Sequence, residues 1–199
     1  QLEHAAHYDA LTGLPNRVLL ADRLQRAMVQ SQRRALSLAV LYLDLDGFKP
    51  VNDRFDHDVG DQLLVAIAQR MKEVLRDGDT ISRIGGDEFV AVLVDLDQEQ
   101  DCLPVLERLL EAASSQFVVD GNRLQVSASI GVTFFPKDDV DADQLMRHAD
   151  QAMYQAKLDG RNRFRFFSQD IERSARGRHL LEQHMRSALE RGVFEVFYQ

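Results

Sequence analysis

A near-continuous apolar run, ALSLAVLYLDLD at 35–46, constrains the fold more than any other segment. Its β-branched and aromatic members predict a strand that is covered on both faces. Because side chains two apart on a strand share a face, Tyr42, Asp44 and Asp46 point one way and the leucines between them the other. With a rise of about 3.3 Å per residue, the two acids lie about 7 Å apart at the end of the strand.

Helical and extended patterns alternate along the rest of the chain. Helical spacing of apolar residues predicts helices over 15–34, 61–75, 98–115 and 141–160. The frequent Gly, Pro, Asn and Asp residues predict a loop or short irregular segment at 47–60. A hairpin of two strands is predicted at 81–93. A short strand, an Asp-Gly turn and a long strand are predicted within 116–135, and a last strand at 161–167. This order predicts an α/β sandwich with a mixed sheet.

Composition narrows the class of function. A chain of 199 residues with 45% hydrophobic and 28% charged residues is typical of one soluble domain with appendages. The net charge of -8 disfavours general nucleic-acid binding, so an anionic ligand would need a metal or a local basic patch. A single cysteine, Cys102, excludes an internal disulfide and favours a reducing, cytoplasmic location. No apolar run approaches the roughly 20 residues of a membrane span, so any membrane attachment would come through upstream segments.

Two acids stand at the bend of the predicted hairpin. Asp87 and Glu88 follow Gly85 and Gly86 in ISRIGGDEFVAVL, where a plain turn with solvated charges is one interpretation. If the hairpin pairs alongside the 35–46 strand, Asp44 and Asp87 converge. Carboxylates that converge at strand ends are suitable ligands for Mg²⁺, which prefers oxygen.

Six collinear blocks resemble one family, from about Tyr8 to Phe167. They are YDALTGLPNR, LYLDLDGFKPVND, HDVGDQLL, RIGGDEFVAVL, VSASIGV and ADQAMYQAKLDGRNR, and together they are similar to GGDEF domains, the diguanylate cyclases that make cyclic di-GMP. The resemblance implies a ferredoxin-like, palm-type α/β (α+β) fold with a mixed, mainly antiparallel central sheet flanked by helices, as in nucleotidyl cyclases and polymerase palm domains.

The resemblance also implies a reaction. A homodimer would condense two GTP into cyclic di-GMP and two pyrophosphates in second-messenger signalling, with Mg²⁺ as cofactor and Mn²⁺ as the alternative metal. The product is also a candidate inhibitor. The competing interpretation is a weak or inactive module that binds GTP or cyclic di-GMP and regulates a downstream EAL phosphodiesterase.

The family's metal site falls on residues already singled out. By resemblance, Asp44, Asp87 and the backbone carbonyl of Leu45 bind the metal. Glu88 would assist deprotonation of the ribose 3′-hydroxyl or hold a second metal, and its alternative is a structural acid on the hairpin.

Phosphate contacts are implied on both sides of this site. Gly85 and Gly86 would let the backbone approach phosphate closely, because a side chain there would obstruct it. Lys157 and Arg161 resemble the family's phosphate-binding pair. The alternative is that basic residues at the end of a helix complement its dipole.

Guanine selection is implied at two positions. Asn52 and Asp61 match the family's base-contacting residues, and a carboxylate accepts hydrogen bonds from guanine's N1–H and exocyclic amine. Asp61 could instead cap the helix predicted to begin there, and Asn52 could be a turn residue.

The segment before this helix carries further matches and two departures from the family. Phe48 and Lys49 match the FK after the metal-binding strand, with Lys49 a further phosphate ligand candidate, and His57 matches the histidine of a GH pair near the guanine site. Asp56 stands where the family has glycine, and because glycine adopts backbone conformations that aspartate adopts less readily, the local backbone here could differ from the family's. Pro50 removes one backbone donor.

A regulatory site and the domain limits complete the predictions. Arg76 and Asp79 form an R-x-x-D that resembles the family's inhibitory site for cyclic di-GMP. Residues 1–7 are expected to end an upstream signalling helix or linker, and 8–167 to form the GGDEF domain. Residues 168–199 resemble a linker helix and the start of a truncated EAL domain.

Overall fold

The computed structural model describes residues 6–173 and 177. The chain divides into two compact units, 1–167 and 168–199, which are treated separately. Of the second unit, the described part contains a short helical stretch at 169–173. The rest of the predicted linker helix and the predicted EAL strand lie outside the described residues.

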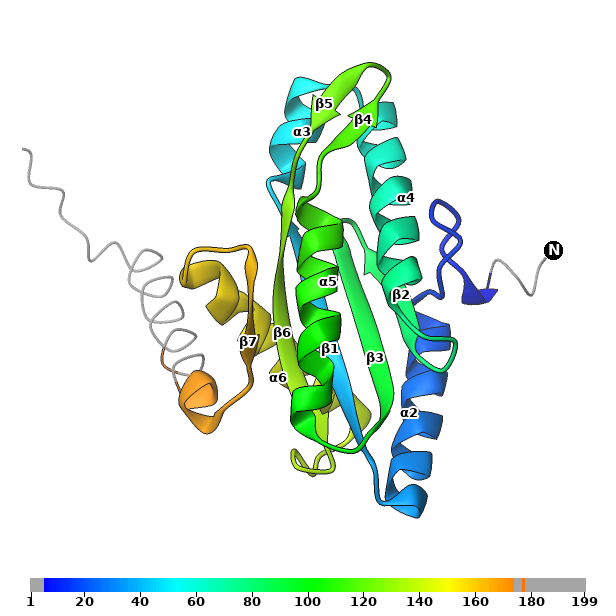
Figure 1. Ribbon diagram of the computed structural model, residues 1–199, viewed down its shortest axis with the longest axis vertical. Helices are drawn as coiled ribbons and strands as arrows, with labels where there is room; N and C mark the ends of the chain where they lie inside the picture. The colour runs from blue at the N-terminus through cyan, green and yellow to red at the C-terminus, as the bar shows by residue number, and fades with distance from the viewer. Residues whose placement is uncertain (1–5, 174–176, 178–199) are drawn as a thin grey trace, which may run out of the picture. The chain divides into compact units, whose positions relative to one another are not determined.

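The first unit alternates helices and strands as the sequence predicts (Figure 1). The helices are α2 (Arg17–Arg34), α3 (Phe48–Arg54), α4 (His57–Val74), α5 (Leu103–Ser114) and α6 (Ala142–Leu158), with a 3₁₀ turn, η1, at Glu99–Cys102. The strands are β1 (Ser37–Asp46), β2 (Thr80–Gly85), β3 (Glu88–Leu96), β4 (Phe117–Val119), β5 (Asn122–Leu124), β6 (Ser127–Phe135) and β7 (Arg163–Phe166). No helix in the described part is long and apolar enough to cross a bilayer.

A five-stranded sheet in the order β2-β3-β1-β6-β7 forms the centre of this unit. The pairings β2–β3, β3–β1 and β1–β6 of this sheet are antiparallel, and β6–β7 is parallel. The predicted mixed, mainly antiparallel sheet flanked by helices is therefore confirmed. The apolar run of β1 takes the central place because both of its faces are buried.

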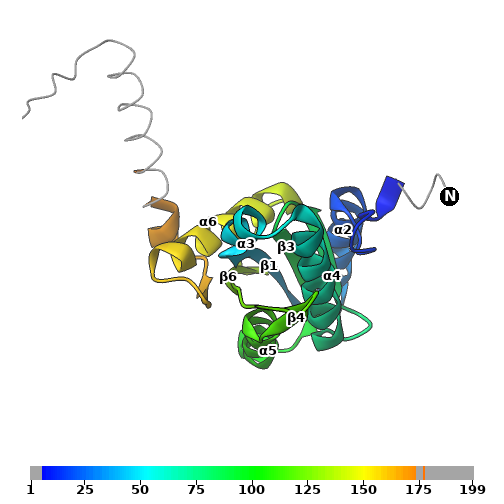
Figure 2. The same ribbon diagram turned by 90° about the horizontal axis from the view of Figure 1, so that it is seen from above.

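Alternation along β1 divides the core into two layers. Leu41 and Leu43 pack with residues of α4 and α5 on one face, whereas Val40 and Tyr42 pack with residues of α2 and α6 on the other. Figure 2 shows β1 and β6 lying between α5 on one side and α6 on the other. The carboxylate of Asp44 continues the Tyr42 face, so it emerges on the side that α6 covers.

The contact between β6 and α6 depends on Gly131. A Cβ added to Gly131 would lie 1.9 Å from the carbonyl oxygen of Ala149 and 2.1 Å from the backbone nitrogen of Met153. The small side chains of Ala149 and Ala152 on the facing helix are fully buried. This close approach fixes the position of α6 and of the residues in its last turn.

The prediction of a loop over 47–60 is wrong, because most of it is helical. Gly47, at φ 78°, makes the sharp turn from β1 into α3, and Pro50 lies in the first turn of α3, where a backbone N–H has no partner within the helix. Asp56 occupies the N-cap position of α4, which begins four residues before the predicted start. Asp61 lies within α4, so it is not the cap of that helix.

The predicted long strand within 116–135 is interrupted. Asp120 and Gly121 make the expected tight turn with positive φ, and β4 and β5 pair across it. β5 pairs with β4, however, whereas β6 pairs with β1. Gln125 and Val126 join the two ladders, which is why one extended run in the sequence becomes two strands.

Candidate functional site

The acids predicted to act together come from two paired strands. Asp44 on β1 lies directly opposite Glu88 at the start of β3. Asp87 lies in the bend, where its carbonyl oxygen accepts a hydrogen bond of 3.1 Å from the backbone N–H of Leu45. The expected pairing of the hairpin alongside β1 is confirmed. Glu88 is the cross-strand partner of Asp44, and Asp87 is tied to the same place through the backbone.

The electrostatics of these acids show that their charges crowd one another. Burial, together with the negative charges of Asp87 and Glu88, raises the pKa of Asp44 to about 6 against the opposing effect of Lys157. Burial also raises the pKa of Glu88, helped by the charges of Asp150 and Asp87. A site with this excess of negative charge favours a cation.

The raised pKa of Asp44 predicts a pH dependence of stability without metal. Since its pKa rises from 3.8 to about 6 on folding, the stabilisation is complete below pH 3.8 and is lost as the pH rises through 6. We expect Asp44→Asn, which mimics the protonated acid, to gain up to about 3 kcal/mol of unfolding free energy relative to wild type between pH 4 and 7. Urea unfolding of both proteins with EDTA measures this, and a pH-independent difference would contradict it.

Lys157, in the last turn of α6, bridges two carboxylates of β1. Its Nζ lies 3.0 Å from Oδ1 of Asp44 and 3.2 Å from Oδ1 of Asp46. Burial lowers the pKa of Lys157, but hydrogen bonds and charges of the two acids outweigh it and hold the pKa above its usual value. The predicted phosphate ligand is thus already engaged with the predicted metal ligand.

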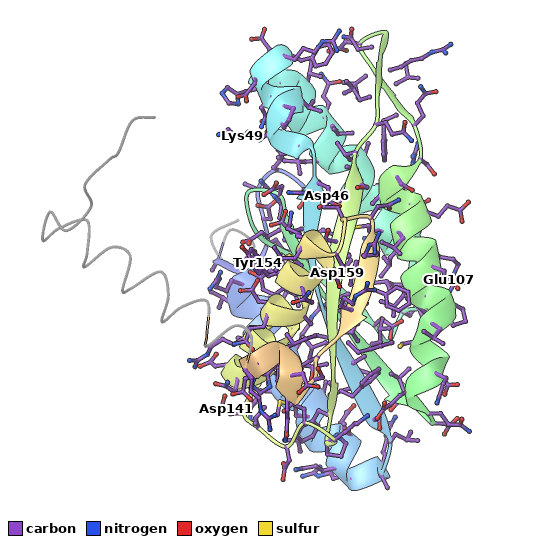
Figure 3. All side chains as sticks on the ribbon, turned by 90° about the vertical axis from the view of Figure 1, so that its left-hand side faces the viewer. Asp46, Lys49, Glu107, Asp141, Tyr154 and Asp159 are labelled. Atoms are coloured by element: carbon purple, nitrogen blue, oxygen red, sulfur yellow. The ribbon has the colours of Figure 1, made fainter. Side chains whose placement is uncertain are left out.

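Asp46 is a residue to which the sequence assigned no role. It is 6% exposed, and its carboxylate accepts hydrogen bonds from Ser127, Ser129, the backbone of Asn162 and Lys157. Figure 3 shows Asp46 beyond the C-terminal end of α6, near the turn that carries Asp159. The only sequence signal for it was its position two residues after Asp44.

Arg161 lies in the turn between α6 and β7. Its φ of 63° is left-handed, and its backbone N–H donates to the carbonyl of Ala156 at 3.0 Å. Its side chain is exposed at the same end of α6 as Lys157. The two basic residues predicted to bind phosphate therefore extend from one helix terminus.

The bend of the hairpin is held from the N-terminal segment. Gly85 and Gly86 have positive φ values of 152° and 50°, and no other atom lies within 4 Å of a Cβ placed on either. The side chain of Arg83 donates to the carbonyl of Gly86 at 2.9 Å and to both oxygens of Asp9 at 3.1 Å. Asp9 also accepts from the backbone and hydroxyl of Thr12. The YDALTGLPNR block thus supports the bend that carries the acids.

The predicted guanine ligands lie where α3 meets α4. Oδ1 of Asn52 is buried and has no hydrogen-bond partner within the described residues, and a Cβ on Gly60 would lie 1.9 Å from it. Asp61, the residue after Gly60, is exposed. Phe48 is buried and lies next to the same glycine, so its ring packs under the site and supports Gly60. The unpaired acceptor of Asn52 is the kind of group that a ligand N–H would satisfy.

The remaining positions near this site are compatible with the fold. Asp56 has φ −63° and ψ 156°, a conformation open to any residue, so glycine is not required there. Its carbonyl accepts from the backbone N–H of Val59 at 3.0 Å. His57 and Lys49 are both exposed, His57 in the first turn of α4 and Lys49 in the first turn of α3.

The R-x-x-D pair is engaged with the sheet. The carboxylate of Asp79 is 1% exposed and accepts from the backbone N–H of Arg76 at 3.2 Å and of Val94 at 3.1 Å. The guanidinium of Arg76 donates to the carbonyl of Val94 at 2.7 Å while remaining 60% exposed. Both residues line a cavity of about 280 Å³, together with Arg108. Asp79 therefore fixes this loop to β3, and Arg76 faces the cavity.

Tyr42 and Asp150 are two further residues to which the sequence analysis gave no functional role. The hydroxyl of Tyr42 lies near enough to Glu88 to lower the pKa of its carboxyl, and the charge of Asp150 on α6 raises the pKa of both groups. Tyr42 and Asp150 line a cavity of about 330 Å³ between α2 and α6, with Arg17 at its edge. Tyr42 and Asp150 therefore lie beside the candidate catalytic acid Glu88, a relation that depends on how α6 packs on the sheet and that the sequence does not show.

Comparison with known proteins gives the family. Residues 6–163 match the family described as "Diguanylate cyclase, GGDEF domain". The bifunctional diguanylate cyclase/cyclic di-GMP phosphodiesterase MucR of Pseudomonas aeruginosa is 41% identical over the whole chain, which covers 29% of its length. The cyclic di-GMP phosphodiesterase NbdA of the same species is 38% identical over the whole chain, which covers 26% of its length. The crystallised GGDEF domain of TpbB (YfiN) from the same species superposes with a TM-score of 0.82 and 36% identity, covering 85% of this chain and 99% of that one. The chain belongs to the GGDEF family of diguanylate cyclase domains.

Proposed function

We propose that this domain is an active diguanylate cyclase that condenses two GTP into cyclic di-GMP and two pyrophosphates. The observation that carries the proposal is the convergence of Asp44 with Asp87 and Glu88, all three charges being crowded at the end of β1. A scaffold role alone would not require three acids at one point, because crowding them costs stability.

The residues present fit a divalent metal. Asp44, Asp87 and the carbonyl of Leu45 supply the oxygen donors that Mg²⁺ prefers, with Mn²⁺ as the alternative. Within the described residues no cluster of three or more His, Cys, Asp or Glu side chains could hold a metal by side chains alone. The proposed set does not need one, because one of its donors is backbone. A bound metal would lower the pKa of the attacking hydroxyl and stabilise the departing pyrophosphate.

The chain's own residues would bind and orient GTP. Asn52 and Asp61 would accept guanine's N–H groups, and bound adenine would leave them unpaired at a cost of roughly 1–3 kcal/mol. Lys157 and Arg161 would neutralise phosphate charge, with Lys49 approaching from α3. Glu88, whose pKa is raised by burial and by the charges of Asp150 and Asp87, would take the proton of the 3′-hydroxyl or hold a second metal.

One domain would hold one GTP, so catalysis would need two domains face to face. Each 3′-hydroxyl would attack the α-phosphate held by the other domain, and holding them together supplies much of the rate. Arg76 and Asp79 would mediate inhibition by the product, with Arg76 contacting it and Asp79 holding the loop that carries Arg76. We also propose that the protein acts in the cytoplasm in signalling and that residues 168–199 lead into an EAL domain. The names of MucR and NbdA, which include phosphodiesterase activity, support the last point.

A second candidate function is a regulatory module that binds GTP or cyclic di-GMP without turnover. The observation that favours it is NbdA, a 38% identical relative named only for phosphodiesterase activity. Retention of Asp44, Asp87, Glu88 and Lys157 in one crowded site favours the cyclase.

The test is incubation of concentrated protein with GTP and Mg²⁺, followed by chromatography for cyclic di-GMP. We expect product from GTP, none from ATP and none with Asp87→Ala. The exposed Asp22, which pairs with Arg26 one turn further along α2, offers the matched control Asp22→Ala, which should leave product formation intact. Tight GTP binding without product, in a sample shown to dimerise, would contradict the cyclase and support the regulatory module.

A further inference from the structure

The carboxylate of Asp46 is fully occupied by hydrogen-bond donors. Oδ1 accepts from Ser129 at 2.8 Å and Lys157 at 3.2 Å, and Oδ2 accepts from Ser127 at 2.9 Å and the backbone N–H of Asn162 at 3.1 Å. The side chain of Asp46 is 5% exposed. A buried carboxylate with four donors is held in one orientation, so it acts as a rigid fixed charge.

Two of these donors connect Asp46 to the predicted phosphate ligands. The N–H of Asn162 can only donate, and it belongs to a left-handed turn that Asn162 shares with Arg161, at φ values of 45° and 63°. Lys157 lies in the last turn of α6, about one turn before Arg161 in the chain. Asp46 therefore anchors both the ammonium of Lys157 and the turn that carries Arg161.

Lys157 is shared between two acids with different surroundings. Asp44 is crowded by Asp87 and Glu88, whereas Asp46 faces hydroxyl and backbone donors. If Asp44 binds a divalent cation, the positive ammonium of Lys157 is repelled from it. Asp46 offers a second carboxylate within 3.2 Å, so Lys157 needs no new partner and stays beside the site.

We propose that Asp46 is a positioning residue that retains Lys157 at the site, aimed at phosphate, when Asp44 takes up a divalent cation. This inference rests on the proposed function, because it assumes that Asp44 is a metal ligand. Asp46 itself touches neither substrate nor metal in this scheme. It makes metal uptake by Asp44 easier, since the displaced ammonium already has a partner.

Direct binding of Mn²⁺, measured by electron paramagnetic resonance without nucleotide, tests the inference independently of turnover. We expect Asp46→Asn to weaken Mn²⁺ binding about tenfold, as loss of an outer-sphere partner does. Lys157→Gln should bind Mn²⁺ more tightly than wild type, because Asp44 loses its competitor. Asp159→Asn is the charge-matched control, since Asp159 pairs with Arg165 at the same end of α6, and it should leave Mn²⁺ affinity unchanged.

The double variant separates a role through Lys157 from a plain loss of negative charge. If Asp46 acts through Lys157, adding Asp46→Asn to Lys157→Gln should change Mn²⁺ affinity by less than about twofold. A full tenfold loss in that background would overturn the inference, as would wild-type affinity in Asp46→Asn or no Mn²⁺ binding by wild type. Thermal unfolding of every variant confirms that each is folded.

The kinetic readout distinguishes this inference from the proposed function. In a protein that makes cyclic di-GMP, Asp46→Asn should raise the KM for GTP, since Lys157 is no longer aimed at phosphate, while Asp159→Asn should not. Product formation with unaltered Mn²⁺ binding in Asp46→Asn leaves the cyclase standing and removes the inference. The expected Mn²⁺ pattern without product leaves the inference standing and removes the cyclase.

Discussion

Replacing Asp44 by asparagine is expected to lower the rate of cyclic di-GMP formation by at least about a hundredfold, because outer-sphere partners of metals are worth 10–100-fold and a direct ligand more. The amide keeps the shape of the carboxylate but removes the charge that attracts the cation. Lys157 retains Asp46 as a partner at 3.2 Å, so its position is kept. Initial rates at saturating GTP over a range of Mg²⁺ concentrations measure the effect.

The same variant carries its own control for folding. Because the pKa of Asp44 is raised to about 6 mainly by burial, the ionised form that predominates at pH 7 is less favourable in the folded protein than in the unfolded chain. Asp44→Asn should therefore unfold at a temperature no lower than wild type when metal is absent. A variant that is inactive and also less stable would not support a metal-ligand role, and a variant that is active at wild-type rates would contradict it outright.

This combination of lost activity and retained stability is what distinguishes a functional acid from a structural one. Asp79 illustrates the contrast, since its 1% exposed carboxylate bonds to the backbone of Arg76 and Val94. Removing it would leave two N–H groups without an acceptor, which costs stability. Asp44 lies among like charges and one ammonium, so we expect it to serve binding more than folding.

The central strand and the acids at its end were predictable because their signals are local. An apolar run covered on both faces predicts β1, and two glycines between extended segments predict the bend before Asp87. The sequence predicted that Asp44 converges with Asp87, whereas the register places Glu88 directly opposite Asp44. Alternation along a strand gives the face of each residue but not the register between two strands.

The short helix α3 was missed because its residues are poor helix formers in isolation. Gly47 serves at its start with a positive φ, and Pro50 lies in the first turn, where it forfeits no hydrogen bond. Residues that interrupt a helix in its middle are harmless at its start. Composition alone does not tell these two positions apart.

The role of Asp46 could not be predicted for a different reason. Its partners Ser127 and Asn162 lie 81 and 116 residues further along the chain, and no spacing in the sequence relates them. They meet only because β1 pairs with β6 and because α6 returns the chain to the end of β1. Side chains that support a site depend on the whole topology, whereas the groups proposed to perform the chemistry are marked by local motifs.

The close contact between Gly131 on β6 and the backbone of α6 allows this dependence on topology to be tested. We expect Gly131→Ala to lower the unfolding free energy by about 3 kcal/mol, at the upper end for an overpacked core. The added Cβ would meet the backbone of Ala149 and Met153 at 1.9 and 2.1 Å, and backbone cannot rotate away as a side chain can. Urea denaturation of the variant and wild type measures the loss.

The folded fraction of Gly131→Ala should also lose activity, because α6 must move away from β6 and Lys157 moves with it. To relieve the contacts of the added Cβ, the helix must shift by about 1 Å or more. Lys157 is 3.0 Å from Asp44 and 3.2 Å from Asp46, so a shift of that size breaks both ion pairs. Gly78→Ala is the matched control, because its Cβ would meet only a side-chain methyl group of Val94 at 3.5 Å. Wild-type stability in Gly131→Ala would show that α6 is not seated on β6 as closely as the structure has it.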